Sequence, residues 1–185
     1  QKRKNSYMKW VQLKTVDSTN NFAKKLIKNN WINTFTTISA EKQLKGRGTK
    51  GRVWYSQDKG GLYMSCVITT ITPNDIKPEK LVVDIATLIQ TEIKKMINIP
   101  IDVEWPNDLM LNNKKLGGIL MEYIQQDKSY LIIGIGLNVN QSIFPSELSK
   151  IATSLKIHTE RTFCITDIIC SISKKIKEHY KNNLN

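Results

Sequence analysis

The sequence predicts an α+β domain in which helices pack on a mixed, largely antiparallel sheet. A strand–helix–strand unit opens the chain, several segments with strand character follow one another closely in its second half, and an amphipathic helix closes it. The 185 residues suffice for a single domain with a substantial core. Strands and helices do not alternate regularly along the chain, which disfavours a Rossmann fold.

The first third of the chain predicts two strands and a helix. Residues 8–16 alternate apolar and polar side chains, as a half-buried strand does. Asp, Ser, Thr and Asn at 17–20 suit a helix cap, and apolar residues then recur at helical spacing from Phe22 to Ile27. Residues 34–40 predict a second strand, which leads through Gln43 into a glycine-rich loop.

A third strand and a long helix are expected next. The strand is predicted over residues 61–70 and a turn over residues 72–75, where Pro, Asn and Asp cluster. Residues 77–97 show the clearest helical pattern, because an apolar stripe runs along one side and Pro78 suits the first turn. Pro100 then marks its end.

The second half of the chain predicts a group of strands followed by helices. Three or four strands are expected, over residues 101–105, 108–111, 115–124 and 129–139. A short helix is expected over residues 146–151, and a final amphipathic helix over residues 165–180.

Composition limits the classes of protein to consider. No apolar run approaches the roughly 20 residues of a membrane-spanning helix, and the N-terminus lacks a signal-peptide pattern. Cys66, Cys164 and Cys170 are widely separated, which argues against a disulfide framework or a zinc site and fits a reducing compartment. The two histidines, His158 and His179, come late, so neither a His-based metal site nor a Ser-His-Asp triad is expected. We therefore expect a cytoplasmic protein whose chemistry depends on Lys, Arg, Asp and backbone amides.

The segment G-R-G-T-K-G-R at 46–52 is the most informative stretch of the sequence. Glycine lets backbone N–H groups approach a ligand, and Arg recognises carboxylate or phosphate with two parallel hydrogen bonds. The loop therefore predicts an anion site, with a flexible linker or a nucleic-acid contact as the alternatives. The net charge of +12 permits steering of an anionic partner, although a drift of the composition toward Lys, Asn and Ile also explains it.

Four polar clusters lie at predicted strand ends or turns, where a rigid scaffold presents side chains. They occupy residues 17–20, 43–52, 104–108 with 115–118, and 134–140. Each alone has a structural explanation as a cap, a turn or a bulge. Four of them in one short domain indicate a binding or catalytic site.

In these clusters the chain resembles the catalytic domain of the biotin protein ligases. Five motifs of that family occur in order, namely D-S-T-N, Q-x-x-G-R-G-x-x-G-R-x-W, W-P-N-D, K-L-x-G-I-L and G-I-G-x-N. The resemblance covers about residues 8–182. It implies a class II synthetase-like fold and a single catalytic domain over residues 1–185, without an N-terminal DNA-binding domain or a C-terminal β-barrel domain.

The resemblance also implies an ATP-dependent ligase with two steps. The biotin carboxylate attacks the α-phosphate of ATP, which gives biotinyl-5′-adenylate and pyrophosphate, and a lysine amine of an acceptor domain then attacks this mixed anhydride. The implied small molecules are biotin, ATP and Mg²⁺, and the implied partner is the biotin carboxyl carrier domain of a biotin-dependent carboxylase. No nucleic-acid or membrane partner is expected, and the oligomeric state stays open between monomer and homodimer.

Residue roles follow from the motif positions of that family. Lys115, Arg47 and Asp108 are expected to be catalytic, with Lys115 beside the carboxylate and the α-phosphate. Asp108 is a candidate for orienting the incoming amine or for meeting Mg²⁺, although no residue is assigned as a metal ligand. The expected ligand-binding residues are Ser18, Thr19, Asn20, Gln43, Gly46, Arg47, Gly48, Thr49, Arg52, Trp54, Asn107, Lys115, Gly117, Gly118 and Asn138.

Within this set the resemblance implies a division of work. Ser18, Thr19 and Gln43 are expected to hydrogen-bond the biotin ring system. Arg47 and Gly48 are expected to lie against the adenylate, while Asn107 and Asn138 contact nucleotide or phosphate. Trp54 is expected to form an apolar lid.

Two positions depart from the family pattern. Thr49 stands where the family usually has a third Arg, which is linked to holding the adenylate, so we hypothesise weaker retention with Lys50 as a possible substitute. Glu104 stands where Lys commonly precedes W-P-N-D, and strand alternation alone does not decide whether it meets the ligand.

Two rival functions remain in view. A lipoate ligase or octanoyl transferase shares the scaffold, but its glycine-rich loop differs from the one found here. A basic nucleic-acid-binding module explains the charge, but only Trp54 and Tyr55 add aromatic rings to the basic loop, and the W-P-N-D and K-L-G-G segments stay unexplained.

Overall fold

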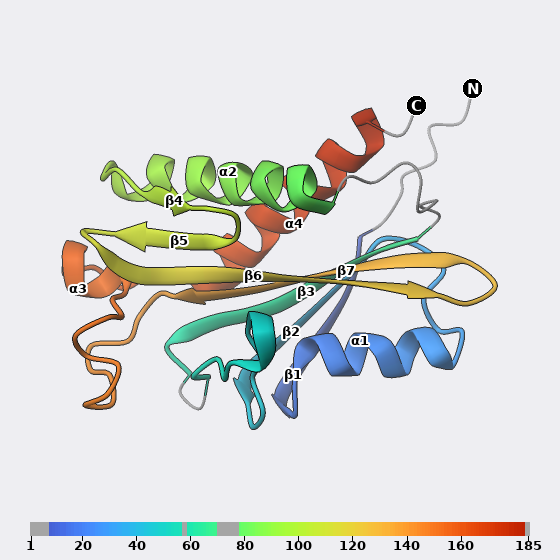
Figure 1. Ribbon diagram of the computed structural model, residues 1–185, viewed down its shortest axis with the longest axis horizontal. Helices are drawn as coiled ribbons and strands as arrows, with labels where there is room; N and C mark the ends of the chain where they lie inside the picture. Colours follow the sequence, from blue (N-terminus) through green and yellow to red (C-terminus); the bar gives the residue numbers. More distant parts are fainter. Residues whose placement is uncertain (1–7, 57–58, 70–77, 184–185) are drawn as a thin grey trace.

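The computed structural model describes residues 8–56, 59–69 and 78–183. Within this part of the chain a single sheet of seven strands forms the framework (Figure 1). Its strands are β1 Lys9–Val16, β2 Thr36–Gln43, β3 Gly61–Thr69, β4 Asp102–Glu104, β5 Asp108–Leu111, β6 Lys114–Gln125 and β7 Ser129–Asn138. The predicted turn at 72–75, with Thr70 and Lys77 at the ends of the predicted strand and helix, lies outside the described residues.

The sheet is mixed and largely antiparallel, as the sequence predicts. Its strands lie in the order β1-β2-β3-β7-β6-β5-β4. The pair β1–β2 is parallel, because α1 Thr19–Lys28 lies between these two strands in the sequence, and the other five neighbouring pairs are antiparallel. The long strand β6 pairs with β7 through a tight turn, so these two strands and β3 form the centre of the sheet.

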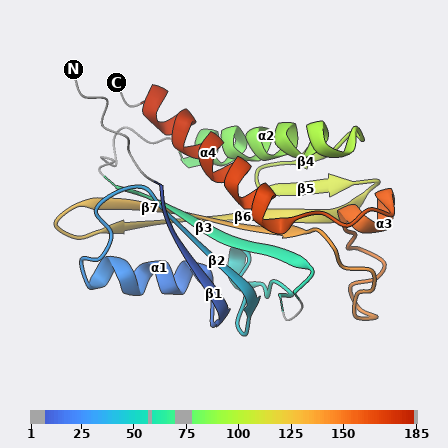
Figure 2. The same cartoon turned by 180° about the vertical axis from the view of Figure 1, so that it is seen from behind.

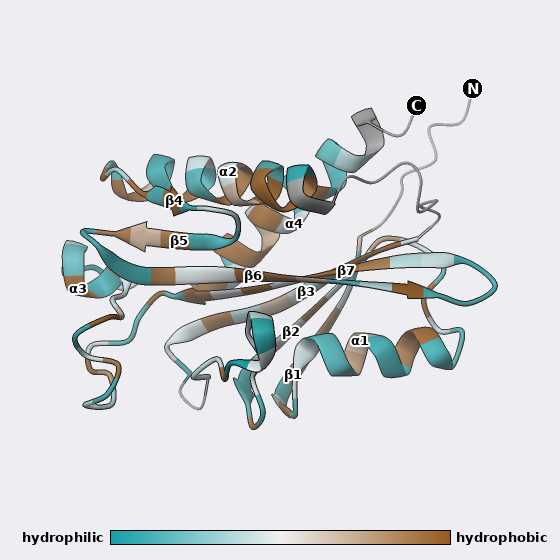
Figure 3. Ribbon diagram, in the orientation of Figure 1, coloured by the Kyte–Doolittle hydropathy of each residue, from teal (hydrophilic) through white to brown (hydrophobic). Residues whose placement is uncertain are grey.

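Helices cover both faces of the sheet. Figures 1 and 2 show α1 on one face, and α2 Pro78–Ile97 with α4 Ile165–Asn183 on the other. On the α2 side a large core includes Ile89 of α2 and Ile172 of α4, both fully buried. A smaller core joins Ile27 of α1 to the opposite face of the sheet. Figure 3 shows hydrophobic residues concentrated along the central strands, as burial on two faces requires.

No helix in the described part of the chain is long and apolar enough to cross a membrane. The cysteines are all free, with Cys66 buried, Cys164 exposed and Cys170 between these extremes.

The predicted helix at 146–151 is wrong. The segment forms hydrogen-bonded turns instead, with the N–H groups of Leu148 and Ser149 both donating to the carbonyl oxygen of Pro145. The carbonyl of Ile151 and the N–H of Thr153 then bond the backbone of Lys115, which prevents a helix from continuing past residue 151. The helix comes later, as α3 Leu155–Thr159, where the hydroxyl of Ser154 accepts the N–H of Ile157.

Candidate functional site

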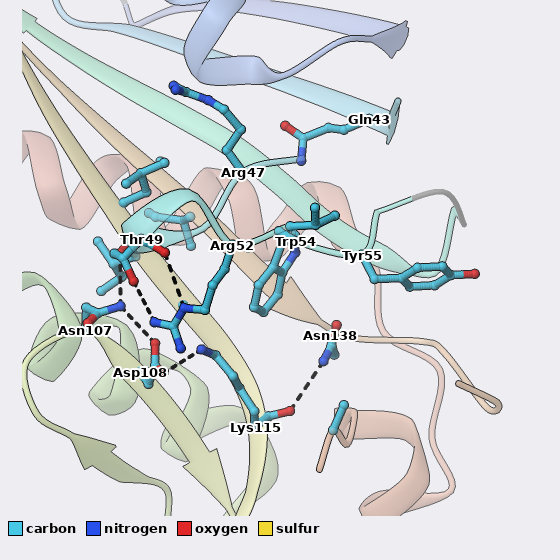
Figure 4. Close-up of a pocket in the computed structure, with 18 of the residues that line it drawn as sticks. Gln43, Arg47, Thr49, Arg52, Trp54, Tyr55, Asn107, Asp108, Lys115 and Asn138 are labelled. Atoms are coloured by element: carbon cyan, nitrogen blue, oxygen red, sulfur yellow. Dashed lines mark hydrogen bonds and ion pairs between the residues drawn. The ribbon is translucent and has the colours of Figure 1, made fainter. Parts of the chain in front are cut away.

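A cavity of about 660 Å³ lies between the glycine-rich loop, the central strands and the segment that follows β7 (Figure 4). Most of the predicted site residues line it, namely Ser18, Thr19, Asn20, Gln43, Arg47, Thr49, Arg52, Trp54, Asn107, Asp108, Lys115, Gly118 and Asn138. The fold thus brings together residues from all four polar clusters of the sequence.

A buried network of neutral polar groups supports one side of the cavity, and we call it the polar floor. Thr19, Asn20 and Gln43 line the cavity, while Ser56 and Ser65 bond to them from outside the lining. The Oε1 atom of Gln43 accepts the backbone N–H of Thr19 at 2.8 Å and the Thr19 hydroxyl at 3.2 Å. Its amide nitrogen donates to Ser56 Oγ at 3.2 Å. The Ser65 hydroxyl lies 2.8 Å from Thr19 Oγ1 and 2.6 Å from Asn20 Oδ1. These groups are therefore fixed before a ligand arrives.

Helix α1 begins here without a side-chain cap. Ser18 occupies the N-cap position in an extended conformation, yet its side chain makes no capping hydrogen bond. Ser18 is buried and lines the cavity. The N-cap position is therefore as the sequence predicts, while the usual capping bond of the hydroxyl is absent.

The glycine-rich loop folds as a small hairpin rather than as an open cradle. Arg47 and Val53 form an isolated antiparallel bridge, and Gly48 N–H donates to the carbonyl of Arg52 at 2.8 Å. Trp54 N–H donates to Gly46 at 2.9 Å. These backbone donors are already paired, so the expected concave site of N–H groups is not formed by them. The side chains of Arg47 and Arg52, which line the cavity, are available to recognise an anion at the loop.

Thr49 and Arg52 hold the tip of the loop together. The Arg52 guanidinium donates to Thr49 Oγ1 at 2.7 Å and to the Thr49 carbonyl at 3.3 Å. Both residues line the cavity (Figure 4). Lys50 has a left-handed backbone with φ of 55° and an exposed side chain, and it does not line the cavity. In this conformation Lys50 does not substitute for a basic residue at position 49.

Trp54 lies directly on the sheet. A Cβ atom on Gly136 would come within 2.5 Å of the indole, and one on Gly118 within 3.5 Å, so these paired glycines form its seat. The Lys115 ammonium is 5.8 Å from the ring centroid. The buried indole N–H has no hydrogen-bond partner among the described residues. To act as the expected apolar lid, the Trp54 indole would have to move away from Gly118 and Gly136.

The opposite side of the cavity carries charge, and we call it the charged side (Thr49, Arg52, Asp108 and Lys115). Lys115 Nζ donates to Asp108 Oδ2 at 2.5 Å, and Asn107 Nδ2 donates to Asp108 Oδ1 at 2.8 Å. Both carboxylate oxygens of Asp108 are therefore occupied. The side chain of Lys115 is 29% exposed, so it can exchange Asp108 for another anion at the cavity surface.

A shift in strand pairing directs Lys115 into the cavity. Leu109 pairs with Gly117 but Met110 pairs with Lys115, so β6 carries one extra residue at this point. The Lys115 backbone instead bonds to residues 151 and 153, and its carbonyl also accepts the amide of Asn138 at 3.4 Å. Such a bulge changes the direction of side chains locally. The extra residue is Leu116, whereas Gly117 and Gly118, which the sequence alone could explain as a bulge, pair in register with Leu109 and Asp108.

Three predicted residues do not line the cavity. Gly46 and Gly117 have packing roles, because a Cβ atom would meet Ser56 at 2.3 Å or the carbonyl of Gly136 at 2.9 Å. Gly48 has more open surroundings. Glu104 is exposed on β4 opposite Asp108 in the pairing register, and it is outside the cavity lining as well.

The structure also adds residues that the sequence did not reveal. Glu122 on β6 contacts two cavity residues, Asn20 and Arg47. The segment after β7 closes one side through Phe144, Leu148, Ile151 and their neighbours. No local pattern in the sequence marks the segment after β7.

The arrangement suits a ligand that is neutral and polar at one end and anionic at the other. Arg47, Arg52 and Lys115 contribute three cations to the lining, against the carboxylates of Asp108 and Glu147. Within the described ranges, no group of three or more His, Cys, Asp or Glu side chains is placed to hold a metal ion. The chemistry available from the chain itself is charge neutralisation and hydrogen bonding.

Proteins with similar sequences are known. Residues 13–140 match the model of the biotin/lipoate A/B protein ligase family. The bifunctional ligase/repressor BirA of Bacillus subtilis is 35% identical over 172 residues, which cover 89% of this chain and 52% of that protein. The chain thus spans about half the length of the curated BirA relatives from Bacillus.

Similar structures have also been solved. The biotin protein ligase from Aquifex aeolicus in complex with biotin and ATP has a TM-score of 0.80 at 34% identity, covering 94% of this chain and 70% of that one. The biotin protein ligase from Leishmania major in complex with biotinyl-5-AMP has a TM-score of 0.73 at 24% identity, with 90% and 72% covered. The second likeness concerns the fold alone.

Proposed function

This chain belongs to the biotin/lipoate A/B protein ligase family, and we propose that it is an ATP-dependent biotin–protein ligase. In the first step, a biotin carboxylate oxygen bonds to the α-phosphorus of ATP while the bond to pyrophosphate breaks. In the second, a lysine amine of the acceptor attacks the carbonyl carbon, AMP leaves, and the amine nitrogen releases a proton. The acceptor is the carrier domain of a biotin-dependent carboxylase.

One observation carries this proposal: a buried neutral polar floor and a charged side face the same cavity. Biotin has a neutral ureido ring, an apolar chain and a terminal carboxylate. The ring matches the hydrogen-bonding groups around Thr19 and Gln43, and the carboxylate matches the cations across the cavity. The Aquifex aeolicus relative with biotin and ATP supports the same ligands.

The chain's own residues then supply positioning and electrostatics. The two reacting groups are both anions, so bringing them together requires fixed cations and donors rather than a covalent nucleophile. Lys115 is proposed to neutralise the charge that develops during transfer to the α-phosphate. Asp108, which holds the Lys115 ammonium, is proposed to keep it aimed into the cavity. Asn107 and Asn138 are proposed to contact nucleotide or phosphate.

Mg²⁺ fits this site only as a companion of ATP. In this structure each Asp108 oxygen accepts one hydrogen bond, from Lys115 or from Asn107. Mg²⁺ commonly keeps several waters and binds through substrate phosphates. We therefore assign it no protein ligand and route no step through it.

The location and partners follow from the same proposal. A cytoplasmic location is supported by the three free cysteines, since reducing compartments keep thiols unpaired. The acceptor lysine must reach the mouth of the cavity, near the charged side. Measurement of the molar mass in solution distinguishes a monomer from a homodimer.

Biotin-dependent exchange of labelled pyrophosphate into ATP tests the first step, and mass spectrometry of a purified carrier domain tests the second. We expect exchange with biotin and a mass increase at one lysine of the carrier domain. Exchange with lipoate or octanoate in place of biotin would assign the chain to the other branch of its family. Binding of RNA or DNA without any exchange would reject ligase function altogether.

A further inference from the structure

Glu122 is a partly buried carboxylate that the proposed chemistry does not use. It lies on β6 opposite Ile132 of β7, and its side chain is 19% exposed. Neither Glu122 nor its partner Lys24 lines the cavity, whereas its other partners Asn20 and Arg47 do. Any effect of Glu122 on a ligand must therefore pass through another side chain.

Three donors from distant parts of the chain converge on this carboxylate. Asn20 Nδ2 donates to Oε2 at 2.9 Å and Arg47 Nη2 donates to the same oxygen at 2.6 Å. Lys24 Nζ donates to Oε1 at 2.7 Å. Glu122 thus ties helix α1 and the glycine-rich loop to the central sheet.

The charges around Glu122 do not balance. Two cations, Lys24 and Arg47, share one anion, so the cluster keeps an excess positive charge at the edge of the cavity. Burial raises the pKa of Glu122. The hydrogen bonds from Lys24, Asn20 and Arg47 together lower it by more than burial raises it, so the pKa lies below its ordinary value. The carboxylate is therefore ionised at neutral pH, and charge-assisted hydrogen bonds of this kind are the strong ones.

Arg47 has a defined direction because of this contact. Figure 4 shows its guanidinium pointing away from Arg52, Asp108 and Lys115. The Arg47 side chain is 37% exposed, and such an arginine would otherwise sample many rotamers. The Asn20 amide on the same oxygen is also fixed, since Ser65 contacts its Oδ1 atom at 2.6 Å. The rigid floor therefore extends through Glu122 to the loop.

We propose that Glu122 is a positioning residue that fixes the direction of the Arg47 side chain at the cavity wall and thereby sets the affinity for the ligand. The inference rests on the proposed function. Under it, Glu122 determines the affinity for biotin and the adenylate without contacting either molecule. The guanidinium keeps donors beyond the one bonded to Glu122, because it has five in a fixed fork. Fixing it beforehand lowers the entropy lost on binding.

The test compares Glu122→Gln with the parent chain in pyrophosphate exchange and in equilibrium binding of biotin. We expect the KM and Kd for biotin to rise about tenfold, the size of one lost charge-assisted hydrogen bond. The kcat should stay within about twofold, because Lys115 and Asp108 are untouched. A fall in kcat with an unchanged KM would overturn the proposal.

Two further variants separate positioning from general destabilisation. Lys24→Met removes the other cation from the same carboxylate, and Glu92→Gln removes a partly buried, ion-paired carboxylate on α2. Both should leave the KM and Kd for biotin within about twofold. If either variant raised the KM and Kd for biotin as much as Glu122→Gln does, the effect of Glu122→Gln would be explained by general destabilisation, and the proposal would be rejected.

A double-mutant cycle tests whether the effect passes through Arg47. In an Arg47→Met background, Glu122→Gln should no longer change biotin affinity, because the side chain it positions is gone. Additive losses would contradict the proposal. If the parent chain shows no biotin-dependent exchange and no biotin binding, the proposed function fails first, which is a result distinct from an active parent with an unaffected Glu122 variant.

Discussion

Two sides of one cavity are built in different ways. On the polar floor, Thr19, Gln43 and Ser65 are at most 6% exposed and bond to one another. On the charged side, the Lys115 side chain is 29% exposed and its ammonium bonds to a carboxylate that a ligand can replace. A buried network can reject a ligand that leaves its groups unpaired, whereas a partly exposed cation mainly supplies charge. We therefore assign ligand selection to the floor and chemistry to the charged side.

The largest effect is expected on the charged side. Lys115→Ala should lower the rate of pyrophosphate exchange by at least ~10²-fold, the loss typical of one electrostatic stabiliser. Lys114→Ala is the matched control, because that neighbouring lysine donates to the carbonyl of Ser149 instead. Near-normal exchange in Lys115→Ala would refute the role of the charged side.

A smaller effect on affinity is expected from the floor. Ser65→Ala removes a hydroxyl that contacts both Thr19 and Asn20, so the KM for biotin should rise about tenfold with little change in kcat. The control is Ser173→Ala, which removes an equally buried hydroxyl that bonds Thr37 on the α4 side. If both variants change KM equally, the floor does not select the ligand.

A change at the tip of the glycine-rich loop should alter the release rate of the adenylate several-fold. Thr49→Arg places a cation at the cavity and ends the contact through which Thr49 holds Arg52. We expect slower release of the adenylate, measured by its dissociation after filtration, with Lys50→Arg as the control outside the cavity. Equal release rates in the parent chain and Thr49→Arg would contradict the hypothesis that Thr49 weakens retention of the adenylate.

The smallest effect concerns acid stability. Because the net pKa of Glu122 is lowered in the folded state, its contribution is present at pH values above the unfolded pKa of about 4.5 and is lost as pH falls through the folded pKa. Urea unfolding between pH 7 and pH 3 should therefore show a smaller acid-dependent loss in Glu122→Gln than in the parent. Identical pH dependence would indicate that the contacts of Glu122 do not stabilise the fold.

Most of the fold was predictable because its signals are local. Alternation along residues 8–16 and the apolar stripe of α2 depend on the period of a strand and of a helix, which neighbouring residues fix. Residues 146–151 form turns instead of the expected helix, and the bonds that residues 151 and 153 make to the distant backbone of Lys115 are a constraint that no local pattern reveals. Ser154 then caps helix α3, which begins at Leu155, four residues after the end of the predicted helix.

The sequence by itself determined which residue types meet in the site, because the motifs carry Gln43, Arg47, Asp108 and Lys115 in a fixed order. Only the tertiary structure decided how they are used. The bulge in β6 turns Lys115 into the cavity, the loop pairs the N–H groups of Gly48 and Arg52 with its own carbonyls, and Glu122 receives donors from 75 to 102 residues away. Such contacts depend on the pairing of distant strands, which periodicity along the chain does not encode.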